Sequence, residues 1–279
     1  MPTLAKTTDH LGRLRRSWLS EQSPKTRTEY DRDFSRFLDW LDSEFSSLTV
    51  EDLQEYRDDL LSTYARSTAR RKLAVVKSFL SYGTRVGAWS HDPGAAVSLP
   101  SASDTKAKRI LSPEQVRAVI DAASEGRDRT LVLFLYVTGA RASEAAGLTW
   151  DDCTERDEGG QVRLVGKGED YRSVRVPAPV WDALATMGTE GPVFASQKGG
   201  PLSRQQIWRI VKRATSRAEG VPDDASTHWL RHAHASHALE GGASIELVRD
   251  TLGHRSIQTT TEYLHARPNE SSSDYLSIE

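Results

Sequence analysis

The sequence predicts a mainly helical protein with a small β-sheet, divided into a helical N-terminal domain and a mixed α+β C-terminal domain. Hydrophobic residues recur every three to four positions through most of the 279 residues, as in amphipathic helices. Alternation typical of strands is confined to residues 161–165 and 172–176. Between residues 97 and 110 the periodicity is lost and Ser, Pro, Thr, Lys and Asp prevail, which predicts a linker. We therefore expect domains at 1–96 and 111–279.

The first hundred residues predict a bundle of four amphipathic helices. Apolar stripes beginning at Leu11, Tyr30 and Leu53 indicate three helices, and Ser67 is placed to cap a fourth. Gly83 begins a run of turn-forming residues that should end this pattern. Aromatic residues on these stripes are expected in the core.

The C-terminal domain should begin with a helix, because Ser112 and Pro113 form a cap and a first-turn proline. The apolar run Leu131–Val137 predicts a buried helix. The two alternating stretches predict a hairpin with Lys167 at its tip. Further helices are expected at 180–187, 204–217, 227–239 and 244–252, and from Ser256 onward.

Charge is unevenly distributed along the chain. A net charge of −2 argues against nucleic-acid binding over the whole surface. Between Leu60 and His91, however, there are six Lys or Arg and no Asp or Glu, and Arg204–Arg217 also lacks acidic residues. Such stretches indicate either patches that bind a phosphate backbone or solvated helix faces. The candidate DNA contacts are Arg66, Arg70, Arg71, Lys72, Lys77, Arg204, Arg209, Lys212 and Arg213.

Cysteine usage and hydropathy bear on location. Cys153 is the single cysteine, which excludes an internal disulfide and suits a reducing compartment. The N-terminus lacks a basic stretch followed by an apolar one, and the longest apolar run is too short to cross a bilayer. We therefore expect a soluble, cytoplasmic protein.

The stretch from Ser226 to His232 predicts the start of a helix with a phosphate site. His228 and Arg231 lie three apart, so a helix places both on one face near its positive end. Such an end favours anion binding, although incidental basic residues are the simpler explanation for one such pair. Zinc is a further alternative because His228, His232, His234 and His237 lie close together in the sequence. It is disfavoured by the missing carboxylate and thiolate and by the alternating spacing.

Four more residues are candidates for the same site when they are considered as a set. Arg141 follows Gly139 at an expected helix start, and Lys167, His254 and Tyr263 lie at later turns or helix ends. Taken singly, they have structural explanations, such as an ion pair between Arg141 and Glu144. Together with His228 and Arg231 they describe phosphoryl transfer, in which cations hold a phosphodiester, Tyr attacks phosphorus and Lys protonates the leaving oxygen. Because the cations stabilise the transition-state charge, we expect no metal and no cofactor.

These residues lie in motifs that resemble those of the tyrosine recombinase, or phage integrase, family. The matching motifs span the C-terminal domain in the family's order: Thr138–Glu144, Gly166–Gly168, His228–His232, Leu252–His254 and Thr261–Tyr263. The helical N-terminal domain resembles the family's core-binding, SAM-like domain. The family often has proline before the first histidine of its third motif. Thr227 stands there in this chain, which alters the helix cap more than the chemistry.

The resemblance implies seven site residues. Tyr263 attacks the scissile phosphate, giving a 3′-phosphotyrosine and a free 5′-hydroxyl, and Lys167 is the general acid on the leaving 5′-oxygen. Arg141, Arg231 and His254 bind the phosphate. His228 assists proton transfer, and Glu144 orients Arg141.

The resemblance also implies partners. The two domains would close around double-stranded DNA carrying an inverted-repeat site, with a dimer on each site and a tetramer in the synapse. Few residues precede the bundle, so we expect the compact, Xer-like type without an arm-binding domain. The polar tail 267–278 is either a frayed terminus or a segment that docks on an adjacent protomer, with Tyr275, Leu276 and Ile278 as anchors.

Three other functions compete with recombination. A type IB topoisomerase shares the chemistry but reseals the same strand. A non-catalytic DNA-binding regulator on the same scaffold should have lost a catalytic residue, whereas every position is present here. A metal-dependent nuclease is disfavoured because no cluster of Asp and Glu accompanies the His and Arg residues.

Overall fold

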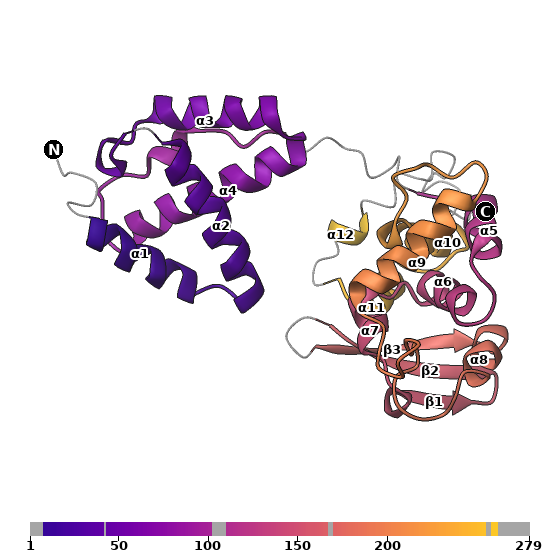
Figure 1. Cartoon of the computed structure of the whole chain (residues 1–279). Coiled ribbons are helices and arrows are strands. Elements are labelled where there is room, and N and C mark those ends of the chain that lie inside the picture. Colours follow the sequence, from indigo (N-terminus) through magenta and orange to yellow (C-terminus); the bar gives the residue numbers. More distant parts are fainter. Residues whose placement is uncertain (1–7, 42, 102–109, 167–169, 255–257, 262–279) are drawn as a thin grey trace, which may run out of the picture. The chain divides into compact units, whose positions relative to one another are not determined.

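The chain folds into two compact units, Met1–Asp104 and Thr105–Glu279. A computed structural model describes residues 8–41, 43–101, 110–166, 170–254 and 258–261 (Figure 1). The expected mainly helical fold with a small sheet is confirmed. Among the described residues, no helix combines the length and the apolar character needed to span a membrane.

The N-terminal unit is a helical bundle. Its described elements are α1 (Thr8–Ser20), α2 (Pro24–Trp40), η1 (Phe45–Ser47), α3 (Val50–Thr63), α4 (Arg66–Arg85) and η2 (Pro93–Ala96). Pro24 occupies the first turn of α2, where its missing N–H costs nothing. Thr49 and Asp52 form a reciprocal capping box at the start of α3.

Aromatic rings fill the centre of this unit. The ring centroid of Phe79 in α4 lies 4.3 Å from that of Phe34 and 5.3 Å from that of Trp18, and all three side chains are buried. Gly83 lies inside α4. Only glycine fits at this position, because a Cβ would come within 1.8 Å of the Trp89 ring. The aromatic stripes are thus core, as expected.

Two local predictions in α4 are wrong. The helix begins at Arg66 with Ala65 at the N-cap, so Ser67 lies in the first turn and does not cap it. The helix also continues through Gly83 to Arg85, because Trp89 packs into the space that the missing side chain leaves. Val97 is buried in this unit's core and Arg70 donates to the Pro100 carbonyl at 2.8 Å, so the first residues after 96 pack on the bundle.

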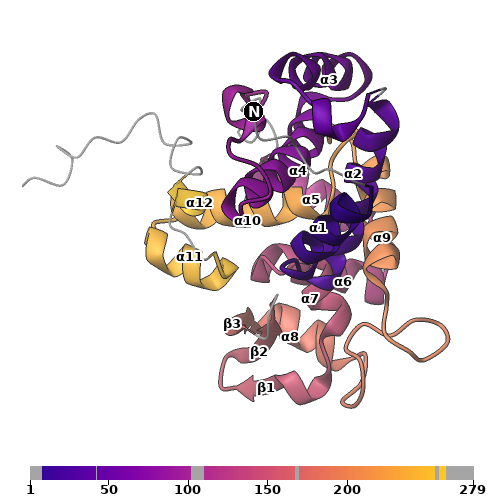
Figure 2. The ribbon, with the colours of Figure 1, turned by 90° about the vertical axis from the view of Figure 1, so that its left-hand side faces the viewer.

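The C-terminal unit combines helices with one sheet. Its described elements are α5 (Pro113–Ala122), α6 (Arg127–Thr138), α7 (Ala142–Gly147), η4 (Trp150–Asp152), β1 (Cys153–Arg156), β2 (Gly159–Val165), β3 (Tyr171–Pro177), α8 (Ala178–Ala185), α9 (Arg204–Arg217), α10 (Thr227–Glu240), α11 (Ile245–Leu252) and α12 (Gln258–Thr261). Figure 2 shows α11 and α12 together near one end of α10.

The sheet is antiparallel in the order β1-β2-β3. The register of the predicted hairpin pairs Val165 with Tyr171, and the Gly166 N–H donates to the Asp170 carbonyl at 2.7 Å. Strand β1 has no signal in the sequence, because its four residues carry no buried apolar side chain that would reveal alternation.

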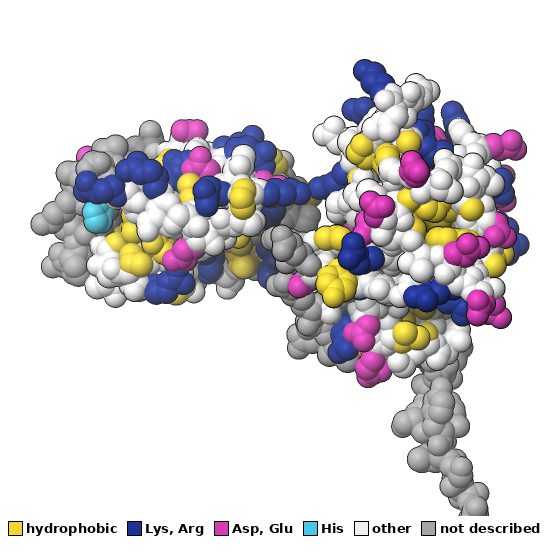
Figure 3. Space-filling model, turned by 90° about the horizontal axis from the view of Figure 1, so that it is seen from below, with side chains coloured by type: hydrophobic (Ala, Val, Ile, Leu, Met, Phe, Trp, Pro, Cys, Tyr) yellow, Lys and Arg dark blue, Asp and Glu magenta, His cyan; other side chains and the backbone are white. Residues whose placement is uncertain are grey.

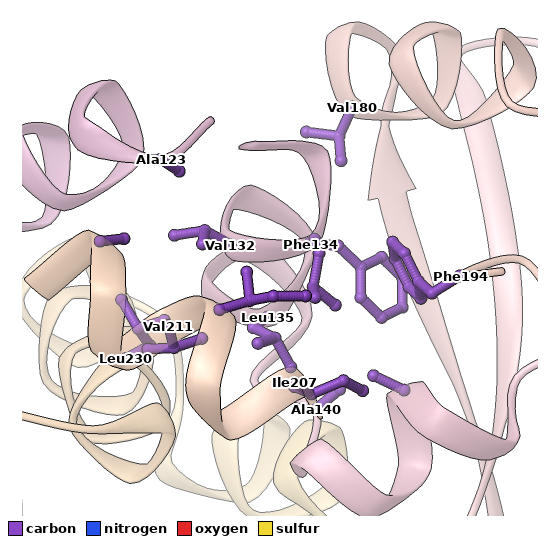
Figure 4. Packing of buried hydrophobic residues seen from close by; sticks show 14 of the residues in the cluster. Ala123, Val132, Phe134, Leu135, Ala140, Val180, Phe194, Ile207, Val211 and Leu230 are labelled. Carbon is purple, nitrogen blue, oxygen red and sulfur yellow. The ribbon is translucent and has the colours of Figure 1, made fainter. Parts of the chain in front are cut away.

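Helix α6 lies at the centre of this unit. Its apolar residues face neighbours on several sides, as the uninterrupted run Leu131–Val137 predicts. Figure 4 shows Phe134 beside Phe194, with ring centroids 5.2 Å apart, and Leu135 near Ile207 of α9. The turn that follows α6 therefore emerges from a rigid core.

Candidate active site and DNA-binding surface

Arg141 stands where α6 gives way to α7. Gly139 ends α6 in the left-handed conformation (φ 60°, ψ 21°), which a residue without Cβ adopts readily. Arg141 is then the N-cap of α7, and its N–H donates to Oε2 of Glu144 at 2.7 Å while its Nη1 donates to Oε1 at 2.6 Å. The Arg141 side chain keeps 37% exposure, so the ion pair coexists with access from solvent.

Glu144 is held by a second arginine that the sequence analysis did not single out. Arg172 of β3 donates from Nη1 and Nη2 to the two carboxylate oxygens at 2.9 and 2.8 Å. Burial alone would raise the pKa of Glu144. The hydrogen bonds from Arg172 and from the Arg141 N–H outweigh it and hold the pKa at about 2. Arg172 shares a strand face with Val174 and Val176, and that inward register was the available signal.

Arg231 lies at the back of the same region. Its side chain comes from α10 and the residue is only 5% exposed. Nη1 donates to the Gly139 carbonyl at 2.5 Å and Nη2 to the Leu252 carbonyl at 2.6 Å. Arg231 thus ties the α6–α7 turn to the end of α11.

His228 lies one turn before Arg231 on α10. Ser226 occupies the predicted N-cap position, although its hydroxyl makes no capping hydrogen bond. Partial burial, followed by the charges of Arg231, Arg204 and Arg141, lowers the pKa of His228. A neutral imidazole in this position can accept a proton near pH 7.

His254 follows the end of α11. Gly253 terminates that helix in the left-handed conformation (φ 65°, ψ 48°), as predicted. Burial and the surrounding arginines, Arg231 first, lower the pKa of His254 to about 4. Its Nδ1 lies 2.9 Å from the hydroxyl of Thr260 in α12, a second partner that the sequence analysis missed.

The neighbouring histidines have partners of their own. His234 Nδ1 lies 2.8 Å from the carbonyl oxygen of Tyr136, and His237 Nδ1 lies 2.9 Å from the hydroxyl of the same tyrosine. Within the described part of the chain, no three His, Cys, Asp or Glu side chains are arranged to hold a metal. The zinc alternative therefore gains no support from these positions.

A groove of about 870 Å³ joins these elements. Arg141 and His228 line it together with Arg204, Trp208 and Arg209 of α9. No acidic side chain is among the described residues that line it, so the groove is suited to an anion. Lys167 and Tyr263, the predicted general acid and nucleophile, lie outside the described residues.

The predicted DNA contacts of the N-terminal unit separate into two groups. Lys72 is buried and its Nζ lies 3.0 Å from Oδ1 of the buried Asp33, which Arg71 also contacts. Lys77 donates to the Gly94 and Val97 carbonyls. The predicted DNA contact of Lys72 is therefore wrong, because Lys72 is buried in an ion pair with Asp33 inside the bundle. Lys77 holds the segment that follows α4 through these two hydrogen bonds. The exposed remainder is Arg66 and Arg71, with Arg70 half-buried.

On α9, most of the predicted residues reach solvent. Arg204, Arg209 and Arg213 are exposed, whereas Lys212 is half-buried and donates to the Asp223 carbonyl. Seen from the side drawn in Figure 3, acidic and basic side chains are interspersed on the C-terminal unit. Of the exposed arginines of α9, Arg204 and Arg209 line the groove beside that helix.

Two family models match the chain. The model of the phage integrase family matches residues 109–270, and the model of the phage integrase N-terminal SAM-like domain matches residues 17–87. The first of these covers more than half of the sequence, including every residue of the groove.

Similar proteins cover nearly the whole length. The chain is 34% identical to tyrosine recombinase XerD of Corynebacterium glutamicum, over 90% of this chain and 93% of that one. It is 32% identical to tyrosine recombinase XerC of a Mycobacterium species, over 88% and 89%. A lambda integrase dimer bound to a COC′ core site has a similar fold, with a TM-score of 0.75 at 17% identity, over 89% and 95%. XerH bound to a palindromic difH substrate gives 0.74 at 19% identity, over 95% and 82%.

Proposed function

Since this chain belongs to the phage integrase family of tyrosine recombinases and is a site-specific recombinase, we propose that its groove beside α9 holds the scissile phosphate of duplex DNA. Tyr263 attacks phosphorus, the P–O5′ bond breaks, and Lys167 protonates the leaving 5′-oxygen. The phosphate remains on Tyr263 as a 3′-phosphotyrosine. A 5′-hydroxyl from another duplex reverses the attack, so strand exchange needs no ATP.

The groove carries the proposal. Arg141 and His228 are 87 positions apart in sequence, yet both line one cavity that Arg204 and Arg209 make cationic. The exposed guanidinium of Arg141 donates to the non-bridging oxygens of the phosphate. Arg231, held by the Gly139 carbonyl, adds a second positive charge that stabilises the negative charge of the transition state. A neutral His228 accepts a proton as Tyr263 attacks.

His254 serves as a neutral donor in this scheme. The tautomer that this role requires carries its proton on Nε2, so that Nδ1 accepts a hydrogen bond from the Thr260 hydroxyl. A low pKa keeps the ring neutral at physiological pH. His254 then adds a hydrogen bond to the phosphate without requiring prior protonation.

The proposed partners are DNA and further copies of the chain. Solved structures with the same fold include a dimer on a core site and a tetramer on a Holliday junction, which supports a dimer on each inverted-repeat site and a tetramer in the synapse. The tail with Tyr275, Leu276 and Ile278 is the proposed contact between protomers. The proposed location is the cytoplasm, since the similar recombinases are those of bacteria such as Corynebacterium glutamicum.

The test is capture of covalent adducts. Cells express the wild type, Tyr263→Phe or Tyr171→Phe, a control that alters an exposed tyrosine of the same unit. DNA that stays attached under denaturing conditions is then sequenced. We expect adducts at a discrete inverted-repeat site from the wild type and the control, and none from Tyr263→Phe.

Two outcomes would refute recombination at a site. Adducts scattered without sequence preference would indicate a topoisomerase. Absence of adducts from all three proteins, despite DNA binding, would indicate a regulator that does not cut DNA.

A further inference from the structure

The end of α11 is capped by two arginines from other elements. The last four carbonyls of a helix have no partner within it. Arg172 donates from Nε to the Thr251 carbonyl at 2.6 Å, and Arg231 donates to the Leu252 carbonyl at the same distance. Both cations also lie at the negative end of the helix dipole. The position of His254, two residues further on, therefore depends on these side chains.

Arg172 makes a second set of contacts at the opposite side of its guanidinium. Its Nη1 and Nη2 grip both oxygens of Glu144, the carboxylate that also receives Arg141. The Arg172 side chain is 11% exposed and that of Glu144 only 2%. One planar side chain thus joins the turn that carries Arg141 to the helix end that carries His254.

Gly253 leaves the space that this arrangement needs. A Cβ at this position would come within 3.2 Å of Cδ and 3.3 Å of Nη1 of Arg172. The left-handed backbone and the close approach of Arg172 require the same glycine.

We propose that Arg172 is a positioning residue for strand cleavage, acting through Glu144 on Arg141 and through the Thr251 carbonyl on His254. This inference rests on the proposed function of the groove. Arg172 is not among the described residues that line the groove. Arg172 and Arg141 both donate to the Glu144 carboxylate. Without Arg172, Glu144 would pair with Arg141 alone and draw the Arg141 guanidinium away from the substrate.

The test uses single-turnover cleavage of the DNA site recovered by adduct capture. The variants are Arg172→Met, which keeps the volume but not the charge, and Arg172→Lys, which keeps the charge but not the planar fork. Arg175→Met is the matched control, because Arg175 lies on the same strand and pairs with Glu158 at the surface. We expect a loss of about 100-fold for Arg172→Met, partial recovery for Arg172→Lys, and a wild-type rate for the control.

A second substrate separates positioning from folding. A methylphosphonate at the scissile position replaces one charged oxygen, so cleavage depends less on Arg141. If Arg172 acts through Arg141, the fold loss in cleavage rate caused by Arg172→Met should be at least tenfold smaller on this substrate. The reason is that the substrate carries less negative charge for Arg141 to bind. An equal loss on both substrates would overturn the proposal, because a merely destabilised protein loses activity on either.

A spectroscopic readout tests the coupling independently of cleavage. If the wild type forms no adduct with DNA, the proposed function is refuted, but the coupling of Arg172 to Glu144 can still be measured. The Glu144 carboxyl is followed by ¹³C NMR. It should titrate at a higher pH in Arg172→Met than in the wild type, and at the wild-type pH in Arg175→Met. An unchanged Glu144 titration in Arg172→Met would overturn the coupling through that carboxylate.

Discussion

Glu144→Gln should make the C-terminal unit less stable by an amount that depends on pH. The substitution keeps the shape of the side chain but removes the charge that faces Arg172 and Arg141. Breaking one partner of a buried ion pair costs about 3–5 kcal/mol. At pH 7 we therefore expect the free energy of unfolding to fall by about that much.

The pH dependence follows from the pKa of Glu144. It lies at about 2 in the folded protein against the usual 4.5. Because the folded-state value is depressed, the carboxylate stabilises the fold above pH 4.5, and this contribution is lost as the pH falls toward 2. The difference corresponds to about 3 kcal/mol in full, of which about 2 kcal/mol is lost between pH 7 and pH 3.

Urea unfolding at pH 7, 5, 4 and 3 measures this difference directly. The gap in unfolding free energy between wild type and Glu144→Gln should narrow by about 2 kcal/mol at pH 3. Glu158→Gln is the control, since its ion pair with Arg175 is exposed and should contribute little at any pH. A gap between wild type and Glu144→Gln that stays constant from pH 7 to 3 would refute the reasoning.

Three further substitutions test other parts of the structure. Lys72→Met should lower the unfolding free energy of the N-terminal unit by about 3 kcal/mol, because it leaves a buried carboxylate with one partner fewer. The salt dependence of its DNA affinity should stay unchanged. Gly253→Ala should destabilise by about 1–2 kcal/mol through its left-handed backbone, and should slow cleavage as well by displacing Arg172. Thr260→Val should slow cleavage about fivefold with little change in DNA affinity, because the imidazole of His254 loses one hydrogen bond.

The first two of these substitutions have matched controls. Arg66→Ala removes an exposed cation and should lower the salt slope by about one without affecting stability, the reverse of Lys72→Met. Gly220 has a similar φ of 71° with nothing near its Cβ position, so Gly220→Ala should destabilise without slowing cleavage. A normal cleavage rate for Gly253→Ala, or for Thr260→Val, would contradict the respective contact.

The sequence predicted most helices because their signals are local. Caps, prolines and apolar periodicity placed α9 at its observed bounds and α11 within one residue. The same signals placed Arg141, His228 and His254 at helix ends, and the structure gathers them around one region. β1 escaped because a short exposed strand has no pattern of its own.

Side-chain partners far apart in sequence were beyond the reach of such patterns. The basic stretch between Leu60 and His91 suggested a basic face for DNA. In the bundle, however, Arg71 and Lys72 of this stretch contact Asp33. Arg172 was likewise assigned to an ordinary strand, although its register beside Val174 marks it as inward-facing.

The cap on α11 has a consequence for the assembly of the proposed site. A chain in which α11 is not folded retains its cationic side chains. It cannot orient Arg231 and Arg172 until the Leu252 and Thr251 carbonyls are in place. The geometry proposed for strand cleavage therefore depends on α11, one of the last described helices of the chain.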